Sequence, residues 1–206
     1  MHKTKTEIHQ LKQKYGDEQV LVVRPELFSD VPTGFTAVDE DEKVIYCKHD
    51  NDGKFVMRYD AEGNPAFLQL IPYVVIKSSN GEYFAYERLS GSGEARLHSQ
   101  LSLGFGGHIN PCDGPSLYIF KGMVRELEEE LIYHNVKPLE YIGMVRDLNS
   151  NLTDHIGFVF ELEVDAAEVK EKDKYKGMWL TKEQLKEKYF LFEGWSKHIV
   201  DHIYEN

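Results

Sequence analysis

The sequence predicts an α/β (α+β) fold in which helices pack on a mixed β-sheet. Strand-like runs alternate with helical segments through the second half of the chain, and short turns join several of those strands into pairs. In residues 156–164, Ile, Phe, Phe, Leu and Val occupy every second position, as in a strand with one buried face. Hairpin-joined strands interleaved with helices are typical of a mixed sheet covered by helices.

The composition narrows the class of protein. With 24 Lys and Arg against 35 Asp and Glu, the formal net charge is −11, which argues against a nucleic-acid or anionic-membrane partner. No apolar run approaches the ~18 residues of a membrane span. The two cysteines, Cys47 and Cys112, form neither a disulfide framework nor a zinc-site spacing. We therefore expect a soluble, reduced, cytoplasmic protein.

Residues 1–68 are expected to form an N-terminal, sheet-rich extension of unknown role. Residues 1–18 are polar and suit a surface helix, and Val20–Val23 is a short apolar run that suits a strand. Two further strand candidates, Val44–Cys47 and Phe55–Arg58, lie between turn signals rich in Gly, Asn, Asp and Pro. The extension carries no recognisable chemistry.

Residues 69–206 are expected to form the main domain. Asn80-Gly81 marks the turn of a hairpin, and Thr181 is a helix N-cap residue. The expected elements, in order, are two strands within Pro72–Leu89, a helix over Ser116–Ile132, strands over Tyr141–Asp147, Ile156–Val164 and Gly177–Leu180, a helix over 182–188, and a last helix over Trp195–Tyr204.

The helix expected over Ser116–Ile132 carries two separate arcs. At 100° per residue, Phe120, Val124, Leu127 and Leu131 fall within about 60° and form the predicted buried stripe. Glu126, Glu129 and Glu130 fall in a second arc, where like charges on adjacent turns repel unless a cation offsets them. Hard divalent cations such as Mg²⁺ bind carboxylates together with substrate phosphates. A solvated acidic face is the alternative interpretation.

The run Arg125-Glu-Leu-Glu-Glu-Glu130 resembles the Arg-Glu-aliphatic-x-Glu-Glu core of the Nudix box, the signature of Nudix hydrolases. Gly106-Gly107-His108-Ile109 is similar to the glycine pair and aliphatic residue that open the family's loop. The resemblance covers residues 69–206 and implies a Nudix-type α/β/α sandwich with a mixed β-sheet.

The box departs from the family pattern at three places. Leu117 stands where the family has its first glutamate, and the segment 110–115 inserts extra residues before the helix. Asp113 in that insertion is a candidate to replace the lost acid, with Arg125 as its partner. Ile132 replaces the box's final glycine, so the chain is expected to leave the helix differently.

The resemblance implies a metal-dependent hydrolase that cleaves the pyrophosphate bond of a nucleoside diphosphate derivative or a related organic pyrophosphate. Glu126, Glu129 and Glu130, with the carbonyl of Gly106, would bind Mg²⁺ or Mn²⁺. Arg125, Glu129 and Glu130 would be the catalytic residues.

The general base and the substrate contacts are less defined. The loop 165–177 offers Asp173, Glu171 and Glu168 as candidate general bases, and Glu161 and Glu163 on the preceding strand are alternatives. Arg88 and His108 are candidate substrate-binding residues for a small-molecule nucleotide or pyrophosphate. The N-terminal extension could serve formation of a homodimer.

Two other functions remain open. An isomerase of the isopentenyl diphosphate type shares the fold and uses a catalytic cysteine, for which Cys112 is the candidate. A non-catalytic nucleotide-binding sensor would retain the fold and the altered box without hydrolysis.

Overall fold

The computed structural model describes residues 3–38, 52–89, 100–150 and 153–205. Its centre is a ten-stranded mixed sheet whose main path runs β12-β5-β4-β10-β9-β2. The strands β4 and β10 pair in parallel, and the other pairs along this path are antiparallel. The bounds along the path are β2 Gly34–Ala37, β4 Leu68–Ser78, β5 Tyr83–Arg88, β9 Glu140–Arg146, β10 His155–Val164 and β12 Tyr175–Leu180. The predicted mixed sheet is confirmed.

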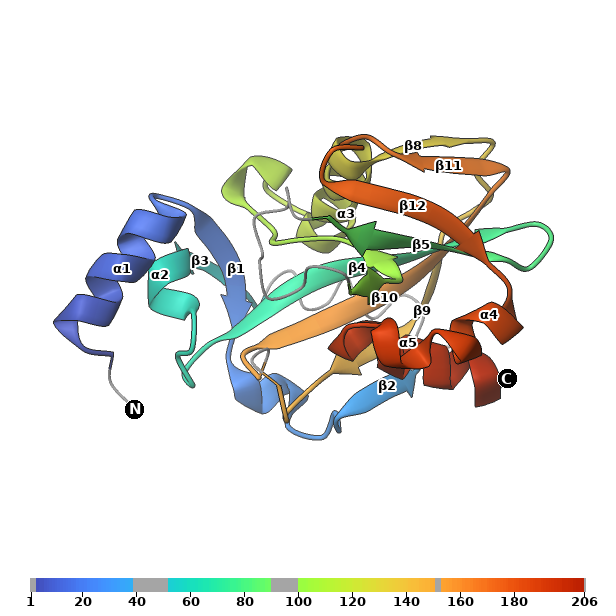
Figure 1. Cartoon of the computed structure of the whole chain (residues 1–206). Helices are drawn as coiled ribbons and strands as arrows, with labels where there is room; N and C mark the ends of the chain where they lie inside the picture. The colour runs from blue at the N-terminus through green and yellow to red at the C-terminus, as the bar shows by residue number, and fades with distance from the viewer. Residues whose placement is uncertain (1–2, 39–51, 90–99, 151–152, 206) are drawn as a thin grey trace.

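The first 68 residues contribute strands to this same sheet. After α1 (Lys5–Tyr15), β1 (Gln19–Val23) pairs with both β3 (Lys54–Met57) and β4. The short helix α2 (Arg58–Ala61) then leads into β4. The strand expected over Val44–Cys47 lies outside the described residues. The N-terminal segment is thus joined to the main sheet by backbone hydrogen bonds, at the left of Figure 1.

Helices cover the two faces of the sheet, as in an α/β/α sandwich (Figure 1). The helix α3 (Tyr118–Glu130) packs on one face, where Met123 and Leu127 join a core that includes Phe158. On the other face, Val159 packs with Ile199 of α5 (Gly194–Glu205), which follows α4 (Lys182–Glu187). The alternation predicted for β10 explains this, because neighbouring side chains of a strand point to opposite faces.

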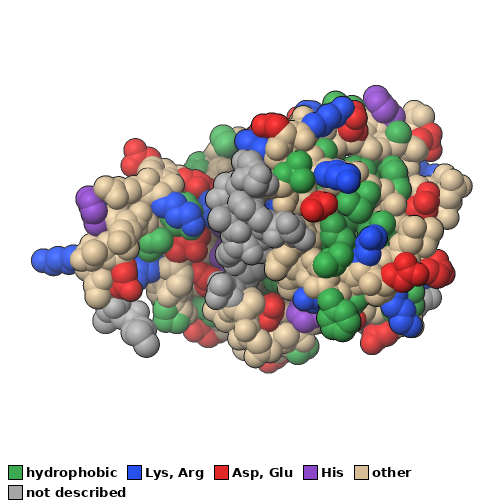
Figure 2. Space-filling view, in the orientation of Figure 1, with side chains coloured by type: hydrophobic (Ala, Val, Ile, Leu, Met, Phe, Trp, Pro, Cys, Tyr) green, Lys and Arg blue, Asp and Glu red, His purple; other side chains and the backbone are tan. Residues whose placement is uncertain are grey.

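The remaining strands are short. They are β6 (Leu101–Ser102), β7 (Gly104–Phe105), β8 (Leu131–His134) and β11 (Ala166–Val169). β8 and β11 form a separate two-stranded sheet. Within the described segments, no helix is both long and apolar enough to cross a bilayer. Acidic and basic side chains are interspersed on the face of the molecule that Figure 2 shows.

The orientation of α3 corrects one prediction. The predicted stripe included Phe120, but this side chain is 40% exposed. The buried positions are Ile119, Gly122, Met123 and Leu127, so the helix is rotated by roughly a quarter turn at 100° per residue. The arc that contains Glu126 and Glu130 therefore faces the protein. Ile119 and Met123 lie one to two turns before Glu126 and supply apolar contact that the predicted stripe did not include.

The end of α3 also differs from the prediction. The helix stops at Glu130, and Leu131 has extended backbone angles (φ −124°, ψ 149°). Leu131 and the next three residues form β8, which pairs with β11, a strand inside the segment that was predicted to be a loop. Pairing with β11 replaces the glycine exit of the usual box, since the chain turns directly from helix into strand.

Candidate active site

Arg125 organises the acidic side of α3. Its Nε donates to Oδ1 of Asp113 at 2.8 Å and its Nη2 donates to Oδ2 at 3.2 Å. The same Nη2 donates to the backbone oxygen of His108 at 2.8 Å. The Asp113 side chain is only 2% exposed. Asp113 therefore takes the place of the glutamate missing from the box, as the sequence suggested, and ties the inserted turn to α3.

Arg125 also contacts two of the predicted metal ligands. Its Nη1 lies 2.6 Å from Oε1 of Glu126 and 3.4 Å from Oε2 of Glu129. The Glu126 side chain is 14% exposed, whereas that of Glu129 is 60% exposed. In this arrangement the guanidinium offsets part of the repulsion between the two carboxylates.

Gly106 and Gly107 allow the loop after β7 to approach the glutamates of α3. A Cβ on Gly106 would lie 1.9 Å from the backbone oxygen of Pro72, and a Cβ on Gly107 would lie 2.7 Å from the carboxylate of Glu126. Gly106 has φ +158° and follows β7 directly. Gly106 therefore requires the absence of a side chain, and at Gly107 a side chain would displace the Glu126 carboxylate.

Glu130 is the most unusual carboxylate of the site. Its Oε2 is buried and has no hydrogen-bond partner among the described residues. Burial, with the charge of Glu126 added, raises the pKa of Glu130 to about 8. An unpaired buried carboxylate oxygen costs free energy, and a cation held between Glu130 and its neighbours would remove that cost.

The loop after β11 closes over the end of α3. Lys170 donates its backbone N–H to the backbone oxygen of Glu130 at 2.9 Å, and its Nζ donates to the backbone oxygen of Glu128. The charge of Glu171 contributes to the raised pKa of Glu130. Glu171 therefore lies within electrostatic range of the acidic cluster.

Arg88 lies at the edge of the same cluster. Its charge opposes the rise in the pKa of Glu130, and its Nη2 donates to the hydroxyl of Tyr86 at 3.1 Å. The guanidinium also lies over the ring of Tyr175, 5.7 Å from the centroid. The sequence did not single out Tyr175, whereas Tyr86, which shares a strand face with Arg88, is a buried core residue.

A hollow of about 500 Å³ adjoins these residues. Phe84, Tyr175 and Trp179 line it together with Lys172 and Lys176. Phe84 and Trp179 are in ring contact, with centroids 5.1 Å apart. Glu168 also lines the hollow, with its Oε1 2.5 Å from Lys172 Nζ. The hollow therefore combines aromatic faces with charged side chains of both signs close to Arg88 and Glu130.

His108 faces away from this cluster. Its Nε2 lies 3.0 Å from Oε1 of Gln69, and its ring is in edge contact with that of His155 at 5.5 Å. Burial lowers the pKa of His108 well below its ordinary value. The structure therefore places this candidate substrate contact among polar side chains at the start of β4 and β10.

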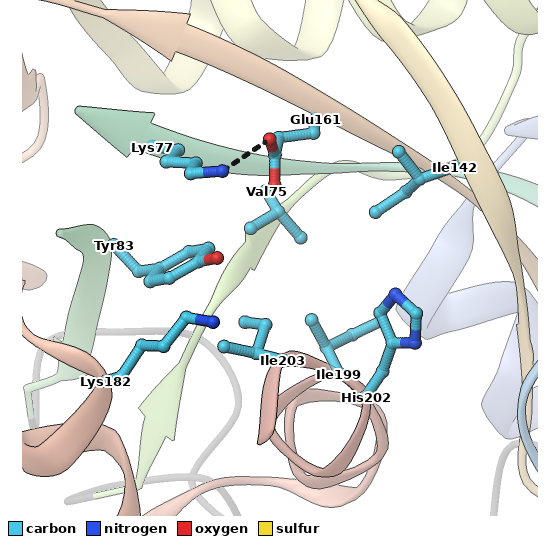
Figure 3. A pocket seen from close by; sticks show the side chains of 9 residues that line it. All are labelled: Val75, Lys77, Tyr83, Ile142, Glu161, Lys182, Ile199, His202 and Ile203. Carbon is cyan, nitrogen blue, oxygen red and sulfur yellow. Dashed lines mark hydrogen bonds and ion pairs between the residues drawn. The ribbon is translucent and has the colours of Figure 1, made fainter. Parts of the chain in front are cut away.

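The α5 side of the sheet holds a different, smaller pocket of about 240 Å³ (Figure 3). Glu161 lies there and accepts from Lys77 Nζ at 3.1 Å. Tyr83, Lys182 and His202 also line this pocket. Glu161 and Glu163 share a face of β10 with Val159, opposite Phe158 and Phe160, so these two candidate bases lie on the face of the sheet away from α3.

Comparison with known proteins agrees with this fold. The chain resembles the solved structure of Tm1382, a candidate Nudix hydrolase, with a TM-score of 0.77 and 28% identity, covering 91% of this chain and 99% of that one. Together with the Arg125–Glu130 motif on α3, this shows that the chain belongs to the Nudix hydrolase family. It is also 38% identical over 200 residues to Protein YmaB of Bacillus subtilis (strain 168), covering 90% of this chain and 97% of the relative. No protein-family model matches the sequence.

The raised pKa of Glu130 predicts how stability depends on pH in the metal-free protein. The folded state holds this proton more tightly than the unfolded state, whose carboxyl has the ordinary pKa of 4.5. The free energy of unfolding should therefore fall as the pH rises from about 5 to about 8. Glu130→Gln removes this dependence, so the variant should gain about 1.4 kcal/mol per pH unit relative to wild type across that range.

Urea unfolding in the presence of chelator at several pH values measures this difference. Parallel pH profiles for wild type and Glu130→Gln would show that the carboxyl does not titrate in the expected range.

Proposed function

We propose that this chain is a metal-dependent pyrophosphohydrolase that acts on a nucleoside diphosphate derivative or a related organic pyrophosphate. Membership of the Nudix hydrolase family supports the reaction class. The observation that carries the proposal is the carboxylate of Glu130, which is buried beside Glu126 and leaves Oε2 without a hydrogen-bond partner among the described residues.

The residues present fit a divalent cation. Glu126, Glu129 and Glu130 would hold Mg²⁺ or Mn²⁺ together with the backbone carbonyl of Gly106, and hard oxygen donors are what these ions prefer. The unpaired Oε2 of Glu130 and the close approach of the Gly107 backbone to the Glu126 carboxylate support this assignment. When bound, the cation would offset the pyrophosphate charge and lower the pKa of the attacking water.

Other side chains of the protein would orient the cation ligands, bind phosphate and accept a proton from the attacking water. Arg125 fixes Glu126 and Glu129 in orientation through Nη1, while Asp113 holds the guanidinium. Arg88 is placed to bind a phosphate oxygen, because it lies between the hollow and the acidic cluster. Glu171 is our candidate for the general base that takes a proton from the attacking water, and Asp173 is the second candidate.

The hollow beside Arg88 supports a nucleotide as the substrate. The aromatic faces of Tyr175 and Trp179 suit a base, while Lys172 and Lys176 suit phosphate or ribose-linked groups. A small-molecule substrate of this kind would place its pyrophosphate toward Glu130. Formation of a homodimer through residues 1–68 and a cytoplasmic location stay predictions.

A cleavage screen tests the proposal. The untagged protein is incubated with nucleoside triphosphates, sugar nucleotides, dinucleotides and non-nucleotide organic pyrophosphates, each with Mg²⁺, with Mn²⁺ and with chelator. We expect cleavage of at least one class with either cation, none with chelator, and a loss of about 100-fold in Glu129→Gln.

Failure to cleave any class, accompanied by measurable nucleotide binding, would favour the non-catalytic sensor. Cleavage that persists undiminished in Glu129→Gln would remove the α3 glutamates from the mechanism.

A further inference from the structure

A second group of metal-ligating side chains lies outside the pyrophosphohydrolase site. Glu62 follows α2, His108 follows the glycine pair, and His155 begins β10. One ligand atom from each of the three lies within 4.8 Å of the others. No other group of three among the described residues meets this criterion, and the α3 glutamates do not.

The orientation of His155 is fixed by a neighbouring carboxylate. Its Nδ1 lies 2.8 Å from Oδ1 of Asp154, and both residues are buried. The other oxygen of Asp154 accepts from the backbone N–H of Gly63 at 2.6 Å and from Nε2 of Gln69 at 3.2 Å. A carboxylate with these donors accepts from His155, so Nδ1 carries the proton and Nε2 keeps its lone pair.

The orientation of His108 follows from the same network. Gln69 donates through its amide nitrogen to Asp154, so its Oε1 is the acceptor for His108 Nε2 at 3.0 Å. The proton of His108 is therefore on Nε2, and the lone pair is on Nδ1. In this way one hydrogen-bonded chain from Asp154 through Gln69 sets the tautomers of both rings.

This arrangement is what a nitrogen-bound metal site requires. A histidine ligand donates its second ring N–H to a carboxylate or carbonyl acceptor, which fixes the ring and raises its basicity. Asp154 and Gln69 supply these two acceptors. Within the described part of the chain neither ring has a second hydrogen-bond partner, so the remaining nitrogen of each ring is available to a cation.

Charged side chains of both signs lie near these ligands. Glu62 is 21% exposed at its side chain, and its Oε1 accepts from Arg58 Nε at 3.1 Å. The guanidinium is shared with Glu18, which lies 3.0 Å from Nη1. Glu18, Glu62 and Asp154 thus supply three carboxylates, while the cationic side chains within electrostatic range are Arg58, Arg125 and Lys3.

We propose that Glu62, His108 and His155 bind one divalent transition-metal ion of the zinc class. Two imidazoles and a carboxylate favour Zn²⁺, Co²⁺ or Ni²⁺ over Mg²⁺, and water would complete the coordination. The ion would join the N-terminal segment at Glu62 to the main sheet at β10. It would also fix His108, whose backbone oxygen accepts from Arg125. The proposal does not depend on the hydrolase activity.

Metal titration of the untagged, chelator-stripped full chain tests this site. Calorimetry with Zn²⁺ should give one tight site per chain, Co²⁺ should develop visible absorption, and Zn²⁺ should raise Tm reversibly. Glu62→Gln and His155→Asn should each weaken Zn²⁺ binding by about 100-fold, and Asp154→Asn by about 10- to 100-fold. The exposed His134 provides the matched control, because His134→Asn should leave Zn²⁺ binding unchanged.

Zn²⁺ binding by two variants distinguishes this site from a site at the α3 glutamates. Zn²⁺ binding that survives in Glu130→Gln but is lost in Glu62→Gln supports the proposal. Binding lost in Glu130→Gln and retained in Glu62→Gln, or no tight Zn²⁺ site at all, overturns it. Circular dichroism and Tm of each metal-free variant show whether it is folded, and the near-isosteric Glu62→Gln keeps the comparison valid if His155→Asn does not fold.

Discussion

Glu130→Gln is expected to lower kcat/KM for pyrophosphate cleavage by about 10²- to 10³-fold. The substitution keeps the size of the side chain but removes the charge that would hold a divalent cation beside Glu126. Because the half-buried side chain of the variant cannot ionise, the protein should remain folded. Because the charge is lost, its activity should respond less to Mn²⁺. Steady-state kinetics with varied Mg²⁺ and Mn²⁺ measure both effects.

Glu128→Gln is the matched control for this prediction. Glu128 lies on the same helix but is exposed, and its described contact with Lys170 involves the backbone oxygen alone. Its activity should be close to wild type. Equal losses in the two variants would mean that the net charge of α3, rather than a cation site at Glu130, governs activity.

Asp113→Ala is expected to destabilise the protein by about 3 kcal/mol. The carboxylate is buried and accepts from Arg125 and from the backbone N–H of Asn110 at 2.8 Å. Its removal leaves the Arg125 guanidinium without its main partner and the inserted turn without its anchor to α3. Urea unfolding monitored by circular dichroism gives the change in free energy.

Cys112→Ala is the control for the inserted turn. Cys112 is the neighbour of Asp113 and is exposed, so its substitution should leave both stability and cleavage unchanged. A large loss of activity in Cys112→Ala would instead revive the isomerase alternative, which depends on that thiol. Unchanged stability in Asp113→Ala would show that Arg125 is held by its other contacts.

The parts of the candidate site that could be predicted are those whose residues lie close together in the sequence. The motif Arg125–Glu130 lies within one helix, so spacing alone indicated which carboxylates are neighbours. Asp113 could be identified as well, since the missing glutamate left Arg125 without a partner. The orientation of α3 could not be predicted reliably, because the apolar residues of the helix form two overlapping arcs and only packing on the sheet selects between them.

Features formed by segments that lie far apart in the sequence were not predicted. The pairing of β8 with β11 depends on a strand of four residues inside an apparent loop, where local propensity is weak. The group of Glu62, His108 and His155 has no metal-binding spacing, because each residue comes from a different element and only the parallel register of β10 beside β4 brings them together.

The antiparallel pairing of β8 with β11 has a mechanical consequence for the enzyme. Glu130 immediately precedes β8 and Glu171 lies just beyond β11, while the Lys170 amide clamps the two chain segments together. A substrate that draws the Glu171 loop inward must therefore also displace the last turn of α3. Substrate and cation would then each tighten the other's binding by the same factor, because such thermodynamic coupling is reciprocal.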